Sequence, residues 1–460
     1  MNTSDAYKLI VNIENSINID IYKFNQFNTW PIVRQILWIE LISVKNKNIK
    51  EKNVFFKKIS YDIFRRFFSF FNLVNPEKNN NSTKIFISRP VYLQKLPSGK
   101  YFDRIVDPII EDSINNNELV DKYYLSLPKH PFNLSFKFRL LIKSKKNAKL
   151  IISNEVRKGL DRISKLTNIE YKILNKRYIK NLSLFVQWYE GSKKIFLNKS
   201  NLKEIYFPGW YFPDLMGVCA AASELKIRTV DVQHGKQGKF HAMYSGWNKI
   251  PKKGFDLMPD NFWCWGDVSC KHILKSSPNR KIHIPFVGGH TWISYYRNNL
   301  NPINRKPKDG IIHVLVTMQP PQGSNIERIP EFLINFLLSK NKNIFFTFRL
   351  HPNDSGGYEY CKRRLSYIND NFFSIDDGKS NLYDLFNIAT HHITSYSSCC
   401  YEAEFFNVPS LIYGLEGKKI YADEINDGVF AYTDGSVNDL NKWLRKKRSD
   451  IKKVLNYIDI

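Results

Sequence analysis

From Lys84 onward, short apolar segments with strand character alternate with segments of helical spacing, and this alternation constrains the fold more than any other feature of the chain. Such alternation is typical of a parallel sheet covered by helices, and we therefore predict an α/β fold. The predicted strand segments are KIFIS (84–88), KLIIS (149–153), EIYFP (204–208), RTVDVQ (228–233), NFWCWG (261–266), KIHIPFVGG (281–289), IIHVLVT (311–317), NIFFTFRL (343–350), FFSI (372–375), HHITS (391–395) and SLIYG (410–414).

The order of these segments predicts two doubly wound, Rossmann-like domains that face a cleft, preceded by a helical region. The predicted parts are a helical, basic region (1–83), a first α/β domain (84–296), a basic linker (297–310), a second α/β domain (311–436) and a C-terminal helix (437–460). Ligands of doubly wound sheets bind outside the carboxyl ends of the strands. Residues that directly follow a strand are therefore the first candidates for chemistry.

The chain of 460 residues has 69 Lys and Arg against 43 Asp and Glu, a net charge of +26, which calls for an anionic partner. Residues 45–84 carry ten Lys and Arg against three acids, and within them FFKKISYDIFRRFFSFF (55–71) mixes aromatic and basic residues at helical intervals. Two interpretations stay open: a helix at an anionic membrane surface, or a core helix with a basic outer face. No apolar run is long enough to span a bilayer, and the N-terminus lacks a signal-peptide pattern, so we predict a cytoplasmic protein, peripheral at the inner face of the membrane.

In the first α/β domain, the segment from Asp231 to Lys239 (DVQHGKQGK) follows a strand. His234 is a candidate general base or phosphate ligand, and Asp231 is an alternative base. Lys236 and Lys239 add positive charge beside two glycines that permit close approach of a ligand. A surface loop with an incidental histidine is the competing interpretation. His290, at the end of a later strand, is a weaker candidate for phosphate binding.

In the second α/β domain, Arg349, His351 and Pro352 stand at the end of a strand, where a cation and an imidazole can contact phosphate oxygens. A plain strand-end turn is the competing interpretation of these three residues. Further on, Ser397 and Ser398 stand where a helix starts, and the free N–H groups of such a terminus favour an anion. Their hydroxyls also suit ordinary helix capping.

Glu402 lies one turn further along the same predicted helix, where it can accept hydrogen bonds from sugar hydroxyls. Together with the serines it predicts a nucleotide pocket, although the chain has neither a GxxxxGK[ST] nor a GxGxxG motif. No metal cofactor is expected, because no Asp-x-Asp, helical His-x-x-x-His or Cys/His ligand cluster occurs. Six cysteines without a Cys-x-x-Cys pair are predicted to be reduced thiols.

The combination of His-Gly in the first domain, Arg-x-His-Pro and then Ser-Tyr-Ser-Ser resembles bacterial GT-B glycosyltransferases that use CMP-activated sugars, such as the capsule Kdo transferases. It is also similar to the CDP-glycerol glycerophosphotransferases of teichoic acid synthesis. The resemblance implies that His351 and Pro352 contact the donor nucleotide, that Ser397 and Ser398 hold its phosphate, and that Glu402 binds ribose. It assigns His234 a catalytic or phosphate-binding role.

We therefore expect a metal-independent glycosyltransferase of capsule, lipopolysaccharide or other cell-surface polysaccharide synthesis. Its partners would be a nucleotide-sugar donor, with a CMP-sugar such as CMP-Kdo favoured, a glycan or lipid-linked acceptor, and the anionic inner-membrane surface, but not nucleic acid. The alternatives are a CDP-polyol phosphotransferase, a nucleotide-sugar epimerase on the same fold and a basic nucleic-acid-binding protein, which would bind with a steep salt dependence.

Overall fold

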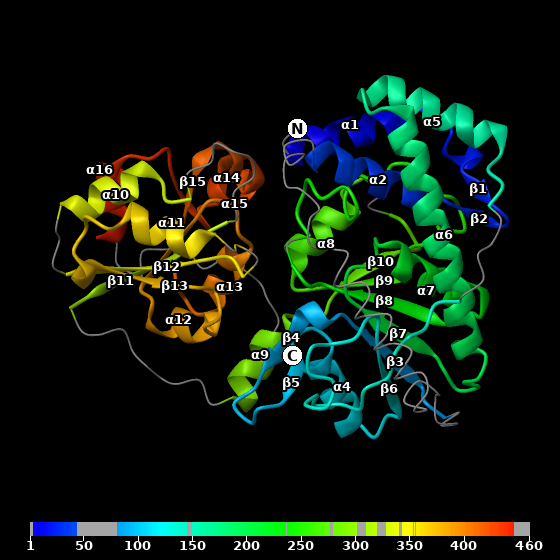
Figure 1. Cartoon of the computed structure of the whole chain (residues 1–460), viewed down its shortest axis with the longest axis horizontal. Helices are drawn as coiled ribbons and strands as arrows, with labels where there is room; N and C mark the ends of the chain where they lie inside the picture. The colour runs from blue at the N-terminus through cyan, green and yellow to red at the C-terminus, as the bar shows by residue number, and fades with distance from the viewer. Residues whose placement is uncertain are drawn as a thin grey trace. The chain divides into compact units, whose positions relative to one another are not determined.

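The computed structural model describes residues 3–43, 81–144, 150–235, 237–276, 279–300, 310–319, 328–339, 343–352, 354 and 356–445 (Figure 1). These residues divide into two units, the first within Met1–Trp292 and the second within Ile293–Asn456. We call them unit 1 and unit 2 and describe each by itself. Helix α9 (Thr291–Asn299) spans the point where the chain passes from one unit to the other.

Unit 1 is built on a parallel sheet of six strands in the order β10-β9-β8-β7-β3-β6. Its helices are α1 (Thr3–Ser16), α2 (Trp30–Ser43), α4 (Asp107–Asn115), α5 (Asn154–Thr167), α6 (Tyr171–Phe196), α7 (Pro213–Glu224) and α8 (Asp267–Leu274). Its strands are β1 (Lys23–Phe24), β2 (Phe27–Asn28), β3 (Lys84–Ser88), β4 (Leu93–Lys95), β5 (Tyr101–Asp103), β6 (Val120–Tyr124), β7 (Glu204–Phe207), β8 (Arg228–Val232), β9 (Asn261–Cys264) and β10 (Ile284–Val287), of which β1–β2 and β4–β5 form separate antiparallel pairs.

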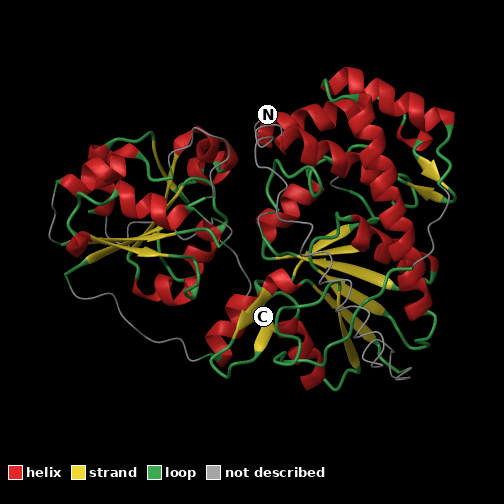
Figure 2. Ribbon diagram, in the orientation of Figure 1, coloured by secondary structure: helices red, strands yellow, loops and turns green. Residues whose placement is uncertain are grey.

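Unit 2 has a second six-stranded parallel sheet, in the order β13-β12-β11-β14-β15-β16. Its strands are β11 (Ile312–Thr317), β12 (Ile344–Arg349), β13 (Phe373–Asp376), β14 (His391–Thr394), β15 (Ser410–Tyr413) and β16 (Ala431–Thr433). Its helices are α10 (Glu331–Leu338), α11 (Gly357–Arg364), α12 (Leu382–Ile388), α13 (Cys399–Phe405), α14 (Gly414–Ile420), α15 (Ala422–Asn426) and α16 (Val437–Leu444). Figure 2 shows helices flanking the strands of each sheet, so the predicted fold of two Rossmann-like α/β domains is confirmed.

Alternate residues along the strands place apolar side chains on both faces of each sheet. In β3, Ile85 and Ile87 belong to the large core shared with α6 and α7, whereas Phe86 packs in a smaller core with Ile109 and Ile110 of α4. A central parallel strand is buried on both faces and therefore has an almost continuous apolar sequence. This explains why KIFIS could be identified as a strand from its sequence.

One predicted strand is wrong: residues 150–153 of the KLIIS segment form no strand. Ile151 is 78% exposed, and the Ser153 hydroxyl accepts a hydrogen bond from the backbone N–H of Val156 at 3.3 Å. The segment therefore leads into helix α5 and ends in its capping residue. Helix α2 begins at Trp30, after the antiparallel pair β1–β2.

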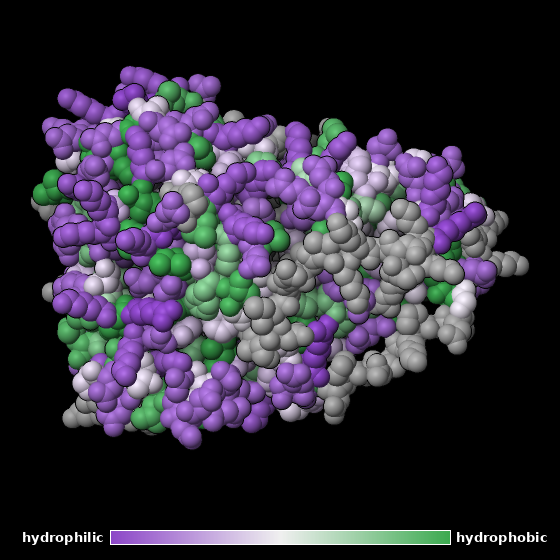
Figure 3. Space-filling view, turned by 180° about the vertical axis from the view of Figure 1, so that it is seen from behind, coloured by the Kyte–Doolittle hydropathy of each residue, from purple (hydrophilic) through white to green (hydrophobic). Residues whose placement is uncertain are grey.

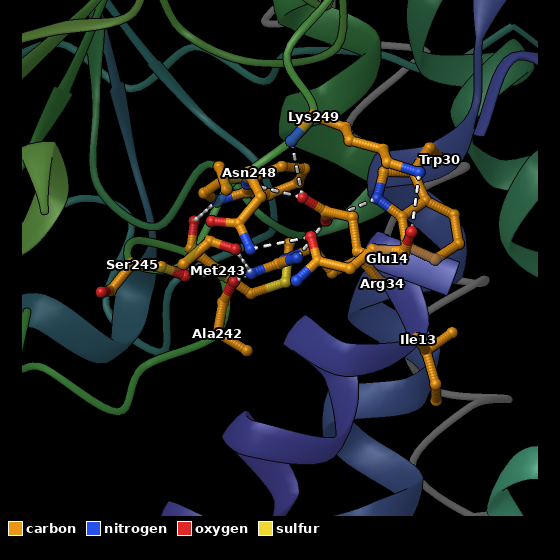
Figure 4. A network of polar contacts seen from close by, with 12 residues as sticks. Ile13, Glu14, Trp30, Arg34, Ala242, Met243, Ser245, Asn248 and Lys249 are labelled. Atoms are coloured by element: carbon orange, nitrogen blue, oxygen red, sulfur yellow. Dashed lines mark hydrogen bonds and ion pairs between the residues drawn. The ribbon is translucent and has the colours of Figure 1, made fainter. Parts of the chain in front are cut away.

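Helices α1 and α2, which the sequence places in a separate N-terminal region, share the core of unit 1. Figure 4 shows how a buried ion pair between Glu14 and Arg34 joins them to the loop 241–249. The Arg34 guanidinium donates to the carbonyls of Ala242 at 2.7 Å, Ser245 at 3.0 Å and Gly246 at 2.9 Å. Because both charges are buried and have hydrogen-bond partners, the pair fixes the position of this loop.

The basic aromatic segment 55–71 and most of the predicted C-terminal helix lie outside the described residues. Within the described residues, we find no helix with both the length and the apolar composition needed to cross a bilayer. On the face seen in Figure 3, hydrophilic side chains alternate with small hydrophobic groups.

Candidate functional site

The strand order of each sheet marks one position where the chain changes direction across the sheet. In unit 1, β6 lies on one side of the first strand, β3, and β7 lies on its other side. In unit 2, β12 and β14 flank the first strand, β11, in the same way. Connections then leave in opposite directions. Doubly wound sheets bind ligands in the crevice at such a point, which here corresponds to the carboxyl ends of β3 and β7, and of β11 and β14.

Aromatic and basic side chains gather at the carboxyl ends of β3, β7 and β8 in unit 1. His234 follows β8, and its ring centroid lies 5.5 Å from that of Tyr92 and 6.3 Å from that of Tyr211. Arg89 follows β3, donates to the Asp214 carboxylate at 2.7 Å and lies over the ring of Phe212 at 4.9 Å. Residues that follow the neighbouring strands β3, β7 and β8 therefore lie close together.

The His234 imidazole is partly buried, and no described residue makes a hydrogen bond to its Nδ1. Burial, with smaller contributions from His241, Arg89 and Arg104, lowers the pKa of His234 to about 3. Gly209 (φ +79°) faces the ring, since a Cβ there would lie 3.3 Å from His234 Cε1. His234 is therefore neutral at pH 7 and has a nitrogen that can interact with a substrate.

Asp231 is buried, and both of its carboxylate oxygens are engaged. Its Oδ1 accepts from the backbone N–H of Gly209 at 2.7 Å and of Trp210 at 3.1 Å, and its Oδ2 accepts from the Tyr244 hydroxyl at 2.9 Å. Burial raises the pKa of Asp231 to about 7, against the effect of these three bonds. Asp231 therefore holds the turn after β7 in place, and Tyr244 connects it to the loop that Arg34 fixes.

The three secondary candidates of unit 1 have different surroundings. Lys236 lies outside the described residues. Lys239 lies over the ring of Phe240 at 5.6 Å. His290 is buried after β10 and stacks on Trp265, with ring centroids 4.2 Å apart. Burial, followed by the Arg104 charge, lowers the pKa of His290 to about 3, so this ring is also neutral at pH 7.

Arg349, at the end of β12 in unit 2, is held by the neighbouring strand end. It donates to the Asp376 carboxylate at 2.7 Å, to the Gly378 carbonyl at 3.3 Å and to the Ser380 carbonyl at 2.9 Å. The ion pair is about nine-tenths buried. These contacts shape the turn after β13, so the guanidinium is largely used within the protein.

His351 and Pro352 begin the turn that follows β12, where the His351 carbonyl accepts from the Asp354 N–H at 2.8 Å. Burial lowers the pKa of the half-buried His351, and the Asp354 charge opposes this. Gly378 (φ +83°) packs against this turn, because a Cβ there would lie 2.7 Å from the Leu350 carbonyl oxygen. The ends of β12 and β13 therefore support each other.

Ser397 and Ser398 precede α13, directly after β14. The Ser397 hydroxyl accepts from the Cys399 N–H at 3.3 Å, and the Ser397 carbonyl accepts from the Tyr421 hydroxyl at 2.7 Å. Ser398 is the residue before the helix, and its side chain makes no capping hydrogen bond. Ser397 therefore caps the helix, and Ser398 lies beside the crevice at β11 and β14.

Glu402, in α13, is buried and accepts from the Tyr383 hydroxyl at 2.8 Å through Oε1. The predicted residues of unit 2 thus follow the two strands on either side of β11. Arg349 is paired with Asp376 and Glu402 with Tyr383. Among the described residues, no three His, Cys, Asp or Glu side chains gather as they would around a metal ion.

Three residues near His234 were not predicted from the sequence: Arg89, Arg104 and Tyr211. Arg89 had a usable signal, because Ser88-Arg89-Pro90 ends a strand at a proline, as Arg349 to Pro352 do. Arg104 and Tyr211 had none, since they reach the cluster only through the folding of β5 and of the turn after β7.

Comparison with solved structures finds proteins of similar fold. A protein named as a UDP-N-acetylglucosamine 2-epimerase from Listeria monocytogenes is 11% identical, with a TM-score of 0.52 over 82% of this chain and 93% of that one. The UDP-GlcNAc 2-epimerase from Neisseria meningitidis is 13% identical, with a TM-score of 0.49 over 80% of this chain and 94% of that one. A UDP-glucosyltransferase from Polygonum tinctorium is 9% identical, with a TM-score of 0.46 over 80% of this chain and 91% of that one. No protein-family model and no curated protein matches the chain. At this identity, the likeness to the Listeria protein shows the fold alone, which is GT-B-like.

Proposed function

We propose that this chain is a metal-independent glycosyltransferase that moves a sugar from a nucleotide-sugar donor to a growing cell-surface polysaccharide or lipid-linked acceptor. A CMP-sugar, such as CMP-Kdo, is the favoured donor on the motif resemblance. Unit 2 would bind the donor and unit 1 the acceptor.

One observation carries this proposal: each sheet has polar side chains shortly after the carboxyl ends of its inner strands. In unit 2 these are His351 after β12 and Ser397 with Ser398 after β14. In unit 1 the corresponding residue is His234, after β8. Two sites of this kind in one chain suit a reaction with two substrates.

The donor phosphate would lie beside Ser398, whose side chain makes no capping bond, with the His351 imidazole as a further donor. Pro352 would contact the nucleotide. Arg349 and Glu402 would act chiefly by shaping the pocket, because Asp376 and Tyr383 already engage them. Preorganised donors beside the leaving phosphate stabilise the charge that develops on it.

His234 is the favoured general base in unit 1, because it has an unpartnered Nδ1, whereas both oxygens of Asp231 are engaged. The acceptor hydroxyl would give its proton to His234. The acceptor oxygen would then bond to the anomeric carbon, and the bond from that carbon to the donor phosphate would break, releasing the nucleotide.

The first test is a thermal-shift screen of the chain with CMP, CDP, UDP, GDP and TDP, followed by transfer assays with the nucleotide sugars that bind. We expect selective stabilisation by CMP, and a lower transfer rate in the His351→Ala and Ser397→Ala variants. The proposal fails if both variants keep the wild-type rate with every nucleotide sugar tested.

Two alternatives give different products in the same assays. A CDP-polyol phosphotransferase would leave phosphate in the product. An epimerase would convert its nucleotide sugar without an acceptor, which deserves a control because the Listeria protein of similar fold is named as an epimerase. Stabilisation by UDP or GDP rather than CMP would overturn the donor assignment.

We also propose that the protein works at the inner face of the cytoplasmic membrane, on the basis of the charge of residues 45–84. Deletion of residues 45–80 should then abolish co-sedimentation with anionic vesicles. Unchanged pelleting of the deletion variant would contradict this localisation.

A further inference from the structure

Three basic side chains of unit 1 interact electrostatically near the carboxyl ends of its strands: Arg89, Arg104 and His234. Arg89 follows β3 and His234 follows β8, while β7 lies between these strands. Arg104 follows β5, and its backbone N–H donates to the Tyr92 carbonyl at 3.2 Å. The Tyr92 ring in turn lies 5.5 Å from the His234 ring, measured between centroids. We call these three residues the basic cluster.

Two members of the basic cluster have polar atoms that no described residue satisfies. Arg89 Nε and His234 Nδ1 are buried and have no hydrogen-bond partner among the described residues. A buried polar atom without a hydrogen-bond partner destabilises a protein, so each such atom calls for an explanation, such as a catalytic role or a bound ion or water. Arg89 Nε is therefore a hydrogen-bond donor that remains for a ligand, and His234 Nδ1 remains for the acceptor hydroxyl of the proposed reaction.

The nearby acids are already engaged. Asp103 accepts from the Ile105 N–H at 2.8 Å and from the Ser88 hydroxyl, and Asp107 pairs with Lys122. Asp231 accepts three hydrogen bonds and interacts electrostatically with Arg89, and Asp214 forms an ion pair with Arg89. The charge of Arg104 is thus not balanced by an ion pair among the described residues.

We infer that the basic cluster binds an oxyanion, a phosphate or carboxylate group carried by the acceptor. This inference rests on the proposed function, in which unit 1 binds the acceptor, and it adds the chemical class of that acceptor. A neutral sugar would leave the Arg104 charge without a counter-charge in a partly buried site, whereas an oxyanion accepts charge-assisted hydrogen bonds from guanidinium groups.

The oxyanion would also change the chemistry of His234. Its imidazole faces Tyr92, Tyr211, His241, Arg89 and Arg104, and the positive neighbours add to burial in keeping its pKa near 3. Such a ring is a weak base at pH 7, because efficient general bases have pKa values close to the working pH. A bound anion opposes both arginine charges, so it would raise this pKa and improve the base only when substrate is present.

The test follows the imidazole of His234 by NMR in the full chain labelled with ¹³C-histidine, using inorganic phosphate, glucuronate and glucose as probes. We expect phosphate and glucuronate to raise the pKa of His234 and glucose to leave it unchanged. Arg89→Gln and Arg104→Gln should each weaken phosphate binding about 10- to 100-fold, the factor expected for one charge-assisted hydrogen bond. Arg157→Gln, an exposed arginine on α5, is the matched control and should bind as the wild type does.

A titration with CMP tests whether the bound phosphate group belongs to the donor nucleotide or to the acceptor. If CMP alone moves the His234 signal and this depends on Arg104, the oxyanion belongs to the donor, and the acceptor assignment is wrong. If phosphate and glucuronate both leave His234 unchanged at millimolar concentration, the inference is overturned. These measurements need no turnover, so anion binding without sugar transfer would contradict only the proposed function, and transfer without anion binding only this inference.

Discussion

The carboxyl ends of the strands are built differently in the two units, although both sheets have the same switch in strand order. In unit 2, the charged groups are paired inside the protein: Arg349 with Asp376, and Glu402 with Tyr383. In unit 1, Arg89 Nε and His234 Nδ1 have no partner among the described residues.

The two units therefore use the strand ends of the same sheet topology for different purposes. Paired charges fix the shape of turns and leave recognition to backbone groups and hydroxyls, which suits a pocket for an invariant nucleotide. Unpaired donors keep their hydrogen-bonding capacity for a ligand and suit the place where a proton or charge changes. We therefore expect mutations at the unit 2 pairs to affect stability and mutations in the unit 1 cluster to affect rate.

The largest expected effect is on rate, in the His234→Gln variant. Loss of a general base lowers kcat about 10²- to 10⁴-fold, while stability changes little because Nδ1 makes no hydrogen bond to a described residue. Steady-state kinetics and thermal unfolding of the same samples measure both. His313→Gln is the control: this ring bonds to Thr347 and to the Ile388 carbonyl near the start of β11, so its loss should lower stability and spare kcat. Equal kcat losses in the two variants would contradict the comparison.

Arg349→Met should have the largest effect on stability. It leaves Asp376 as an uncompensated buried charge, which costs about 3–5 kcal/mol. Hydrogen exchange followed by mass spectrometry should show faster exchange in β12 and β13 but not in the sheet of unit 1. Arg364→Met breaks the exposed pair with Glu331 and should cost no more than about 1 kcal/mol. A stable Arg349→Met variant with weak donor binding would mean that Arg349 contacts the phosphate instead.

A feature of the fold or of the candidate site could be predicted from the sequence only where neighbouring residues in the chain indicate it. Pro352 and Gly235 mark strand ends in the sequence itself, so the fold and the position of His234 and His351 could be predicted from neighbouring residues. The pairing of Arg349 with Asp376 could not, because it depends on β12 lying beside β13, 27 positions away in sequence. The partners of Asp231, which are Gly209, Trp210 and Tyr244, could not be predicted either, because they also come from other parts of the sequence.

Asp231→Asn tests whether Asp231 is a base or a positioning residue. Asparagine can keep the contacts to Gly209, Trp210 and Tyr244, but it does not titrate. Because burial raises the pKa of Asp231 from 3.8 to about 7, the folded state binds this proton more tightly than the unfolded state does. The wild type therefore loses stability as the pH rises from about 4 to about 7, whereas this contribution is missing in the variant.

At pH 8 the Asp231→Asn variant should be more stable than the wild type, by at most about 4 kcal/mol, and at pH 4 the two should be similar. Burial also raises the pKa of Asp107 to about 7. Its pH-dependent contribution to stability is the same in both proteins, so it cancels when the two free energies of unfolding are subtracted. Denaturant unfolding across this pH range measures the effect. If kcat instead falls as far as in His234→Gln, Asp231 is the base and the assignment of His234 is wrong.

The smallest expected effect distinguishes capping from ligand binding at the unit 2 site. Ser397→Ala removes the hydroxyl that accepts from the Cys399 N–H, which should cost about 1 kcal/mol of stability. Ser436→Ala removes an equivalent cap, which accepts from the Asp439 N–H at 3.3 Å at the start of α16, next to the outermost strand β16. If the unit 2 crevice binds the donor, only Ser397→Ala should also weaken nucleotide binding in calorimetry. Equal nucleotide affinity in the two variants would reduce Ser397 to a helix cap, and recognition of the phosphate would then depend on Ser398 and the backbone.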